Sequence, residues 1–501
     1  MNQMPTETGT PNPLQRVGST LFDGRRLRGI LAIDERENCI ALAQIMIGRL
    51  VIGLVALATV STSYDWWHAA LVVGAAMASA FFPKYRNAII FGATWVVAFL
   101  YLWLSKTFVP DYISNVMEQE YVENISPLAL ACGATLFFLI CAWCTLWLAR
   151  RDKTWFFARR PIMTLIGLAA VLCGLTSLDG VQGLSRVLLC SILIVYTRYL
   201  WFLAYAIIDQ RSREASPPLF QLGVFRPFWS SSSIPIGKGA AFLRKALSKT
   251  PRDLAVTQIK GLKLLLWANI LLALKLALTW FFEDHLQVPS VELAMDAFLH
   301  HQPFSIHVGW ASLIWSTTKF CLKAAYGGHL FVGVARLAGF RLARNTWRPL
   351  ESRTLMEYFN RFSYYFKELL VDFFFLPTFF TTFRNHPRLR MFFATFMAAG
   401  VGNAIWHFIR DIDVVATMGL AGAFETYTSY AFYCLILATG VGVSQVRASM
   451  GVKPSATFFG RLHSFLFVWS FVVCLHVFSD ESRNHTLGER LSFLASLFGV
   501  S

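Results

Sequence analysis

Residues 128–148 read LALACGATLFFLICAWCTLWL, and none of them is charged. As an α-helix this stretch would extend about 30 Å, which is the thickness of the hydrocarbon core of a bilayer. A helix on the surface of a soluble domain carries a polar face, and this stretch has none. The stretch therefore predicts a helix that crosses a membrane.

The composition of the whole chain agrees with this prediction. Of its 501 residues, 15% are charged and 55% are hydrophobic, and the mean hydropathy is +0.50. Soluble proteins carry roughly 25% charged residues, so a soluble enzyme is excluded. The formal net charge is +16, and in so apolar a chain an excess of Lys and Arg is typical of cytoplasmic loops. We therefore expect contact with membrane lipids and no nucleic-acid partner.

Apolar runs recur along the chain from residue 41 onward. They predict an all-α polytopic membrane protein with about 11 transmembrane helices. The second and last runs are short, and Gly327-Gly328 predicts an interruption of the eighth. The runs cover residues 41–62, 69–82, 88–104, 128–148, 163–178, 187–208, 264–282, 308–330, 392–408, 418–441 and 465–478.

Charged residues between the runs predict the orientation, because Lys and Arg resist translocation. Basic and acidic loops alternate, with Lys106 and Arg186 as exceptions, so we expect a cytoplasmic N-terminus and a C-terminus outside. The basic segments hold Arg25, Arg26, Arg28 and Arg36, then Lys84 and Arg86, then residues 150–160, then residues 211–263; the acidic loops hold Asp65, Glu118, Glu120, Glu123, Asp179, Glu283 and Asp284.

This pattern divides the chain into five segments. A cytoplasmic N-terminal segment, 1–40, precedes the N-terminal transmembrane helices, 41–208. A cytoplasmic basic loop, 209–263, leads into a core, 264–445, and a C-terminal helix and tail, 446–501.

The nine cysteines lie almost entirely within apolar runs and lack His or Cys neighbours at ligand spacing. We therefore expect no disulfide framework and no metal site.

Between residues 339 and 377 the apolar runs give way to aromatic residues crowded with Arg and Asn. Such a stretch predicts short helices in or dipping into the membrane, where irregular backbone persists only against protein or a cavity. An interfacial aromatic belt is the alternative. Arg344, Arg348 and Arg361 are cations suited to the phosphates of a nucleotide tail. A general bias of positive charge toward the cytoplasm would also explain them.

The ninth predicted span contains a histidine, within the sequence GVGNAIWHF at residues 400–408. His407 is a functional candidate because ionisable residues are costly inside a membrane; the alternative is a structural histidine bonded to a neighbouring helix. Asn403 lies four residues earlier, shares the helix face and could orient the ring. A neutral imidazole in an apolar pocket suits the removal of a proton from a hydroxyl. Gly400 and Gly402 would permit close helix approach.

An ordered set of short motifs between about residues 261 and 441 resembles the core of the membrane-bound O-acyltransferase family. The resemblance is nearest to the bacterial branch that acetylates alginate or transfers D-alanine to teichoic acids. The residues that carry it are Tyr326-Gly327-Gly328-His329, Gly333, Arg336-Leu337, Gly339-Phe340, Asn345, Arg348-Pro349, Tyr358-Phe359-Asn360-Arg361-Phe362-Ser363, Asp372, Pro377 and Trp406-His407.

This resemblance implies that the core, 264–445, is acyltransferase-like, a bundle of helices around a central funnel with His407 as the catalytic histidine. The earlier histidine of the family aligns with Ser363, and the first arginine of the same block aligns with Asn360. Either one histidine suffices, or His329 or Asn360 substitutes, or activity is weakened. Asn403, Asn360, Arg361, Ser363 and His329 are thus the supporting residues, and Arg344 and Arg348 are the candidates for donor binding.

The leading functional interpretation is an O-acyltransferase of the bacterial inner membrane. It would move an acyl group, acetyl in the first instance, from acetyl-CoA or another acyl thioester to a hydroxyl of an extracytoplasmic polysaccharide or partner protein. No tightly bound cofactor is expected, and a periplasmic acetyltransferase is a candidate partner. The alternatives are a polytopic glycan or lipid transporter, and a non-catalytic scaffold of a polysaccharide-export complex, which the replacement at Ser363 would explain.

Overall fold

The computed structural model describes residues 32–104, 108–212, 215–479 and 484–500, so Arg25, Arg26 and Arg28 lie outside the described residues. Within those ranges the chain forms helices and loops, with a single isolated β-bridge between Leu247 and Phe340. The first third contains α2 (Glu37–Gln44), α3 (Met46–Val60), α4 (Trp66–Phe81), α5 (Arg86–Trp103), α6 (Val109–Gln119), α7 (Pro127–Arg151), α8 (Phe156–Arg159), α9 (Pro161–Thr176) and α10 (Leu184–Gln210).

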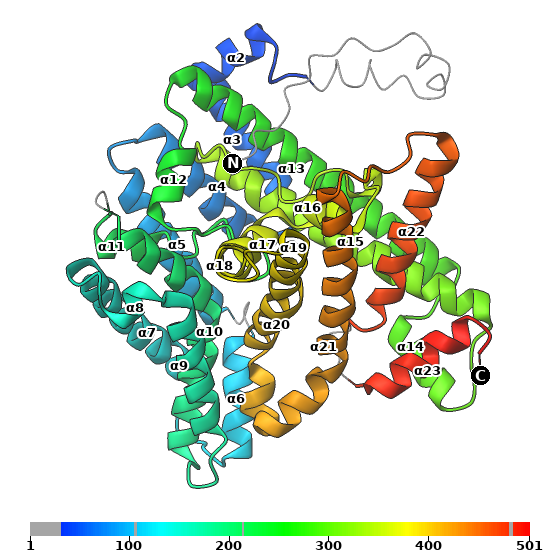
Figure 1. The fold of residues 1–501 in the computed structure, drawn as a ribbon. Helices are drawn as coiled ribbons and strands as arrows, with labels where there is room; N and C mark the ends of the chain where they lie inside the picture. The colour runs from blue at the N-terminus through cyan, green and yellow to red at the C-terminus, as the bar shows by residue number, and fades with distance from the viewer. Residues whose placement is uncertain (1–31, 105–107, 213–214, 480–483, 501) are drawn as a thin grey trace.

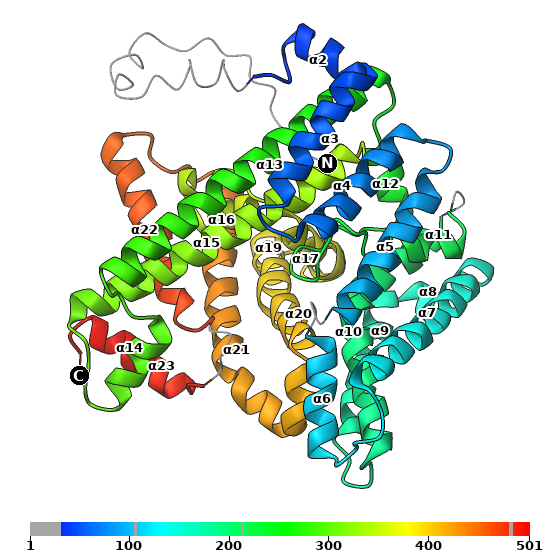
Figure 2. The same ribbon diagram turned by 180° about the vertical axis from the view of Figure 1, so that it is seen from behind.

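The rest of the chain combines short helices with four long ones (Figures 1 and 2). The middle third contains α11 (Pro218–Gly223), α12 (Ala240–Ala246), α13 (Pro251–Thr279), η2 (Trp280–His285), α14 (Val291–Leu299) and α15 (Ile306–Leu337). The last third contains η3 (Pro349–Glu351), α16 (Leu355–Phe362), α17 (Tyr364–Leu370), η4 (Val371–Phe375), α18 (Leu376–Thr381), α19 (Pro387–Phe396), η5 (Met397–Gly402), α20 (Asn403–Arg410), α21 (Asp413–Ser449), α22 (Phe458–His476) and α23 (Leu487–Leu497).

Seven helical segments among the described residues are long and apolar enough to cross a membrane. They are α5, α7, α10, α13 with η2, α19 through α20, α21 and α22, and each coincides with a predicted run. The run at 41–62 forms α2 and α3, which meet at 95° and would count as one further span. The runs at 69–82 and 163–178 form the shorter helices α4 and α9. The run at 308–330 lies within α15, which carries Lys319 and Lys323.

The predicted interruption at Gly327-Gly328 is wrong, because α15 continues unbroken from Ile306 to Leu337. The missing side chain at Gly328 serves packing instead, since a Cβ there would lie 2.8 Å from Cβ of Asn345. The same helix crosses α13 closely, and a Cβ on Gly261 would lie 2.9 Å from the carbonyl oxygen of Gly333. Figures 1 and 2 show α13 and α15 running side by side.

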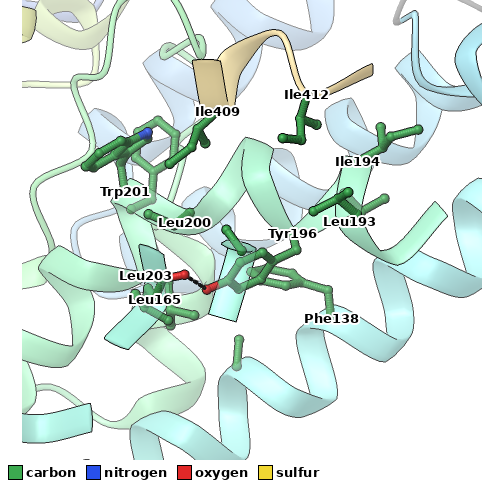
Figure 3. Packing of buried hydrophobic residues seen from close by; sticks show 14 of the residues in the cluster. Phe138, Leu165, Leu193, Ile194, Tyr196, Leu200, Trp201, Leu203, Ile409 and Ile412 are labelled. Carbon is green, nitrogen blue, oxygen red and sulfur yellow. Dashed lines mark hydrogen bonds between the residues drawn. The ribbon is translucent and has the colours of Figure 1, made fainter. Parts of the chain in front are cut away.

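Helix α10 forms the centre of the largest apolar core and packs against α7, α9 and α20. Figure 3 shows Leu200 and Trp201 of this helix beside Ile409 of α20. On another face of α10 the hydroxyl of Tyr196 donates a hydrogen bond of 2.7 Å to the carbonyl oxygen of Leu165. A buried tyrosine needs such a partner for its hydroxyl, and the bond ties α9 to α10.

The segment from residue 339 to 377 contains short helices, as its sequence predicts. Helices α16, α17 and α18 have only eight, seven and six residues. Figures 1 and 2 show α17 and α18 at the centre of the molecule, beside α19. The long helix α21 follows and bends at Gly419, whose φ of 72° requires the conformational freedom of glycine. The short helix α17 and the long helix α21 both contact α20.

Candidate functional site

A short π-helix precedes α20, the helix that carries His407. Residues Met397–Gly402 form the π-helix η5 between α19 and α20, and such turns occur frequently at functional sites. Its glycines lie in close contact with neighbouring elements. A Cβ on Gly402 would lie 2.5 Å from the ring of Phe374, and one on Gly400 would lie 2.9 Å from Cβ of Ala438. The prediction that these glycines permit close helix approach is confirmed.

His407 lies on α20, half-buried among aromatic rings. The centroid of its imidazole is 4.3 Å from that of Tyr430, 4.7 Å from that of Trp406 and 6.0 Å from that of Phe366. A hydrogen bond of 2.5 Å from the hydroxyl of Tyr427 to the carbonyl oxygen of Ala404 fixes α21 against α20. Helices α17, α20 and α21 therefore hold this imidazole between them.

Asn403 opens α20 one turn before His407 and is only 3% exposed. Its side-chain oxygen Oδ1 is buried and has no hydrogen-bond partner among the described residues. A buried amide oxygen without a partner costs free energy, so folding alone does not explain an asparagine here. The register of the helix places it on the face of His407, as the sequence predicts.

Ser363 lies between α16 and α17 and is half-buried. Its carbonyl oxygen accepts a 3.0 Å hydrogen bond from the amide of Lys367, so it begins the first turn of α17. Phe366, which contacts the imidazole of His407, follows three residues later on α17. The structure thus brings α17, the helix that follows Ser363, to the site, and Phe366 is the residue that contacts His407.

The basic residues proposed for donor binding separate into two groups. Arg361 pairs with Glu357 and lies 3.7 Å from Glu351, while Arg348 lies 3.2 Å from Glu351. Both guanidinium groups also lie over the ring of Trp347. Their charges are therefore engaged in holding η3 to α16.

Arg344 is exposed and forms no ion pair with any described residue, which leaves its charge available to a ligand. Asn360 is also exposed, at the end of α16. Nearby backbone bonds fix this surface, because the amide of Trp347 donates to the carbonyl oxygen of Arg361 over 2.8 Å. Of the predicted donor-binding residues, Arg344 is the one without an acidic partner in the described chain.

His329 lies on α15, and its ring nitrogen Nδ1 donates a 2.7 Å hydrogen bond to the carbonyl oxygen of Ala325. The carbonyl can only accept, so Nδ1 carries the proton and Nε2 is the acceptor nitrogen. The contacts of this ring are local to α15, whereas those of His407 come from α17, α20 and α21. His329 is thus positioned by its own helix.

A cluster of ionisable residues next to the short helices is absent from the sequence-based predictions. Lys238, in the loop before α12, lies 2.7 Å from Oδ2 of Asp372 and 3.5 Å from Glu368. The hydroxyl of Tyr205, on α10, donates to the same Asp372 oxygen over 2.8 Å. The sequence could not associate these residues, because 130 and 134 positions separate Lys238 from Glu368 and Asp372.

Tyr430, which lies nearest to the imidazole of His407, is also missing from the predictions. A signal for it exists in the sequence, since Tyr427, Tyr430 and Tyr433 recur every third residue and so share one face of α21.

No protein-family model and no curated protein sequence matches the chain. What the structure contributes is the position of His407, near the end of the helical segment Pro387–Arg410 and between rings from three elements.

Proposed function

We propose that this protein is a membrane O-acyltransferase with His407 as its general base. The observation that carries the proposal is the setting of His407: a half-buried imidazole between Tyr430, Trp406 and Phe366, one turn after the buried Asn403. The resemblance of the ordered motifs from Tyr326 to His407 supports the same chemistry. In this proposal about eleven crossings surround a funnel that joins the two faces of the inner membrane.

The proposed reaction needs one base and one electrophile. A nitrogen of the His407 imidazole takes the proton from an acceptor hydroxyl, and the resulting oxygen attacks the carbonyl carbon of an acyl thioester. The carbon–sulfur bond breaks, an ester forms, and the proton leaves with the thiol. Asn403 would orient the imidazole through its amide group. No resident cofactor is required, because acetyl-CoA or another acyl thioester supplies the acyl group.

The donor would enter from the cytoplasmic face, where Arg344 offers an exposed positive charge to its phosphates. The acceptor is a hydroxyl of an extracytoplasmic polysaccharide, or of a periplasmic acetyltransferase that passes the group on. His407 lies in the last turn of the segment that runs from Pro387 to Arg410. In the proposed orientation the segment ends toward the outer face, within reach of such an acceptor.

The decisive experiment compares the envelope glycans of cells that carry the wild-type protein or His407→Gln. Glutamine keeps a similar volume and a hydrogen-bonding group but cannot take a proton near neutral pH. Loss of a general base typically costs about 10² to 10⁴-fold in rate. Mass analysis should therefore show loss of an acyl mass in the variant, while the amount of protein and its elution profile in detergent stay unchanged. Acylation at the wild-type rate would overturn the proposal.

Ser363→Ala separates the possible roles of the position where the family has its earlier histidine. If one histidine suffices, the variant should retain acyl transfer within about tenfold, which corresponds to about 1.4 kcal/mol in the barrier. The same glycan analysis measures this. A loss as large as that of His407→Gln would assign an essential role to Ser363 itself.

A further inference from the structure

A cavity of about 730 Å³ lies at the turn between α3 and α4, far along the chain from the residues of the candidate site. Cavities of about 300–1,000 Å³ commonly hold small molecules. Its walls combine aromatic rings, hydroxyl groups, one carboxylate and one histidine. The lining residues are Ser61, Thr62, Ser63, Tyr64, Asp65, Trp66, Trp67, His68 and Tyr101.

The depth of this cavity distinguishes it from an interfacial aromatic belt. The hydroxyl of Thr62 donates a 2.9 Å hydrogen bond to Oδ1 of Asn269 on α13. At 1.5 Å per residue, Asn269 lies about 27 Å from Pro251 and about 24 Å from His285, the two ends of that continuous helical segment. Within the apolar run 264–282, which is predicted to cross the membrane, Asn269 lies about 8 Å from the start, whereas belt residues occur at the ends of spanning helices.

The lengths of the two helices lead to the same conclusion. Helix α3 has 15 residues and α4 has 16, so each extends only about 22–24 Å against a hydrocarbon core of about 30 Å. Each helix is therefore about 6–8 Å shorter than the core, which places the turn between them inside the hydrocarbon layer. Polar side chains at that depth are expensive unless they line a cavity or serve a function.

One wall of the cavity is held in place by a buried contact. His68 is 4% exposed, and its Nε2 lies 2.7 Å from the hydroxyl of Tyr101 on α5. The ring of Tyr64 packs edge-on against the same imidazole, with a centroid distance of 4.4 Å. These contacts join α3, α4 and α5 around the cavity, so its aromatic side is positioned before any ligand enters.

The lining chemistry fits a sugar. A pyranose ring presents C–H groups on its faces and hydroxyls around its edge. Aromatic faces, which are electron-rich, attract the C–H groups, and serine, threonine and aspartate side chains exchange hydrogen bonds with the hydroxyls. The nine lining residues include one carboxylate, Asp65, and neither lysine nor arginine. No cation in the lining is therefore available to pair with a phosphate or a uronate, although the charge of Arg226 acts on Tyr101.

We propose that this cavity binds one or two neutral sugar units, carried on a free glycan or on a lipid head group. The binding of sugar does not depend on the proposed acyltransferase function. Aromatic rings would stack on the faces of the sugar, and Asp65 with the neighbouring hydroxyls would select its hydroxyl pattern.

The test uses the full-length protein in phospholipid nanodiscs, because maltoside detergents would themselves occupy a sugar site. Four photoreactive diazirine disaccharides serve as probes, with glucose, galactose, mannose or N-acetylglucosamine units. Mass spectrometry should locate the label of at least one probe in residues 61–68 or at Tyr101. Competition by the free disaccharide indicates a glycan ligand, and competition only by the same sugar on a diacylglycerol in the disc indicates a lipid head group.

Matched variants test whether the cavity is responsible. Asp65→Asn and Trp67→Leu should each reduce the labelling at least tenfold, while Trp103→Leu should leave it unchanged, because Trp103 is an exposed residue of α5 outside the cavity. His407→Gln should also label normally, so a failure of the acyltransferase proposal is distinguishable from a failure of this one. Absence of labelling with all four probes, or equal labelling of Trp67→Leu and wild type, would overturn the proposal.

Discussion

At the scale of single residues, Gly402 gives the most direct test of how η5 packs. An added Cβ would lie 2.5 Å from the ring of Phe374, so the ring or the helix must move. Overpacking of this kind typically costs about 1–3 kcal/mol. We therefore expect Gly402→Ala to lower the unfolding temperature of the purified protein in detergent.

Gly133→Ala is the matched control for this substitution. Gly133 lies on α7, and a Cβ there would meet nothing within 4 Å. Alanine is the better helix former of the two residues, so this variant should be as stable as the wild type or slightly more stable. Equal unfolding temperatures for the two variants would contradict the close packing of η5.

Asn403→Leu should separate stability from function. The Oδ1 atom of Asn403 is buried without a hydrogen-bond partner in the described chain, and such an atom costs about 1–3 kcal/mol. The near-isosteric leucine should therefore leave the unfolding temperature unchanged or raise it. Under the proposed mechanism the same variant should lose at least tenfold in acyl transfer, measured on the envelope glycans. A clear drop in stability would instead identify Asn403 as a structural residue.

At the scale of elements, the contact between Lys238 and Asp372 joins the loop before α12 to η4. Removing one partner of a buried ion pair lowers the free energy of unfolding by about 3–5 kcal/mol. About a third of the Asp372 side chain is exposed, and solvent weakens the pair. We therefore expect Lys238→Met or Asp372→Asn to lower the free energy of unfolding by about 1–3 kcal/mol. The double variant should cost clearly less than the sum of the two, which a double-mutant cycle of thermal unfolding measures.

The pair of Arg252 and Glu37 provides the control for that cycle. Its side chains are 55% and 69% exposed, and exposed ion pairs contribute little. Arg252→Gln and Glu37→Gln should therefore leave the unfolding temperature nearly unchanged and show no measurable coupling. Additive effects at Lys238 and Asp372 would show that their contact does not stabilise the fold.

Helix α23 begins with a capping box whose strength depends on pH. The amide of Thr486 donates to Oε2 of Glu489 over 2.7 Å, and the amide of Glu489 donates back to the hydroxyl of Thr486. The bond from the Thr486 amide above all, and then the Thr486 hydroxyl, hold the pKa of the Glu489 carboxyl below its ordinary value of 4.5. A lowered carboxyl pKa stabilises the folded helix above pH 4.5, and that contribution is lost as the pH falls through the lowered pKa.

Hydrogen exchange of residues 487–497 should show this loss, after correction for the intrinsic exchange rate at each pH. Protection should decrease below about pH 4.5 in the wild type and much less in Glu489→Gln. Thr486→Ala removes the cap at every pH and should cost about 0.5–2 kcal/mol of local stability. Protection of the wild-type helix that does not change with pH would refute this account.

At the scale of the whole molecule, several contacts join segments that the alternation of charge predicts on the same side of the membrane. Glu120 pairs with Arg186 over 2.8 Å and accepts from the amide of Gly183, so two loops predicted to lie outside share one end of α7. His485, in the C-terminal segment, lies 2.8 Å from Asp296 of α14, which follows the acidic loop of Glu283 and Asp284. Asp34, in the N-terminal segment predicted to lie on the opposite side, pairs with Lys263 of α13.

These contacts give the topology experiment a definite expected outcome. Single-cysteine accessibility should place Lys153 and Lys249 on the cytoplasmic side, and Glu120 and Asp284 on the outer side. Glu120 and Lys153 flank the two ends of α7, which has 25 residues and extends about 37 Å. Labelling of both positions from one side of the membrane would contradict the predicted orientation of this helix.

The sequence by itself determined the all-helical class, seven of the spanning segments, the series of short helices after residue 339 and the candidacy of His407. These properties depend on hydropathy and on spacings of three or four residues, which are local. Gly327-Gly328 shows where local reasoning fails. The pair predicts a break, but α15 continues because Asn345 packs against Gly328.

Only the tertiary structure decided which distant residues meet. The rings around His407 come from three helices, Lys238 reaches Asp372 across more than 130 positions, and Thr62 places the turn between α3 and α4 against the middle of α13. The physical reason is that an apolar run specifies burial in lipid or protein without specifying a partner. The partner is selected by close packing and by the pairing of buried polar groups, both of which depend on the whole fold.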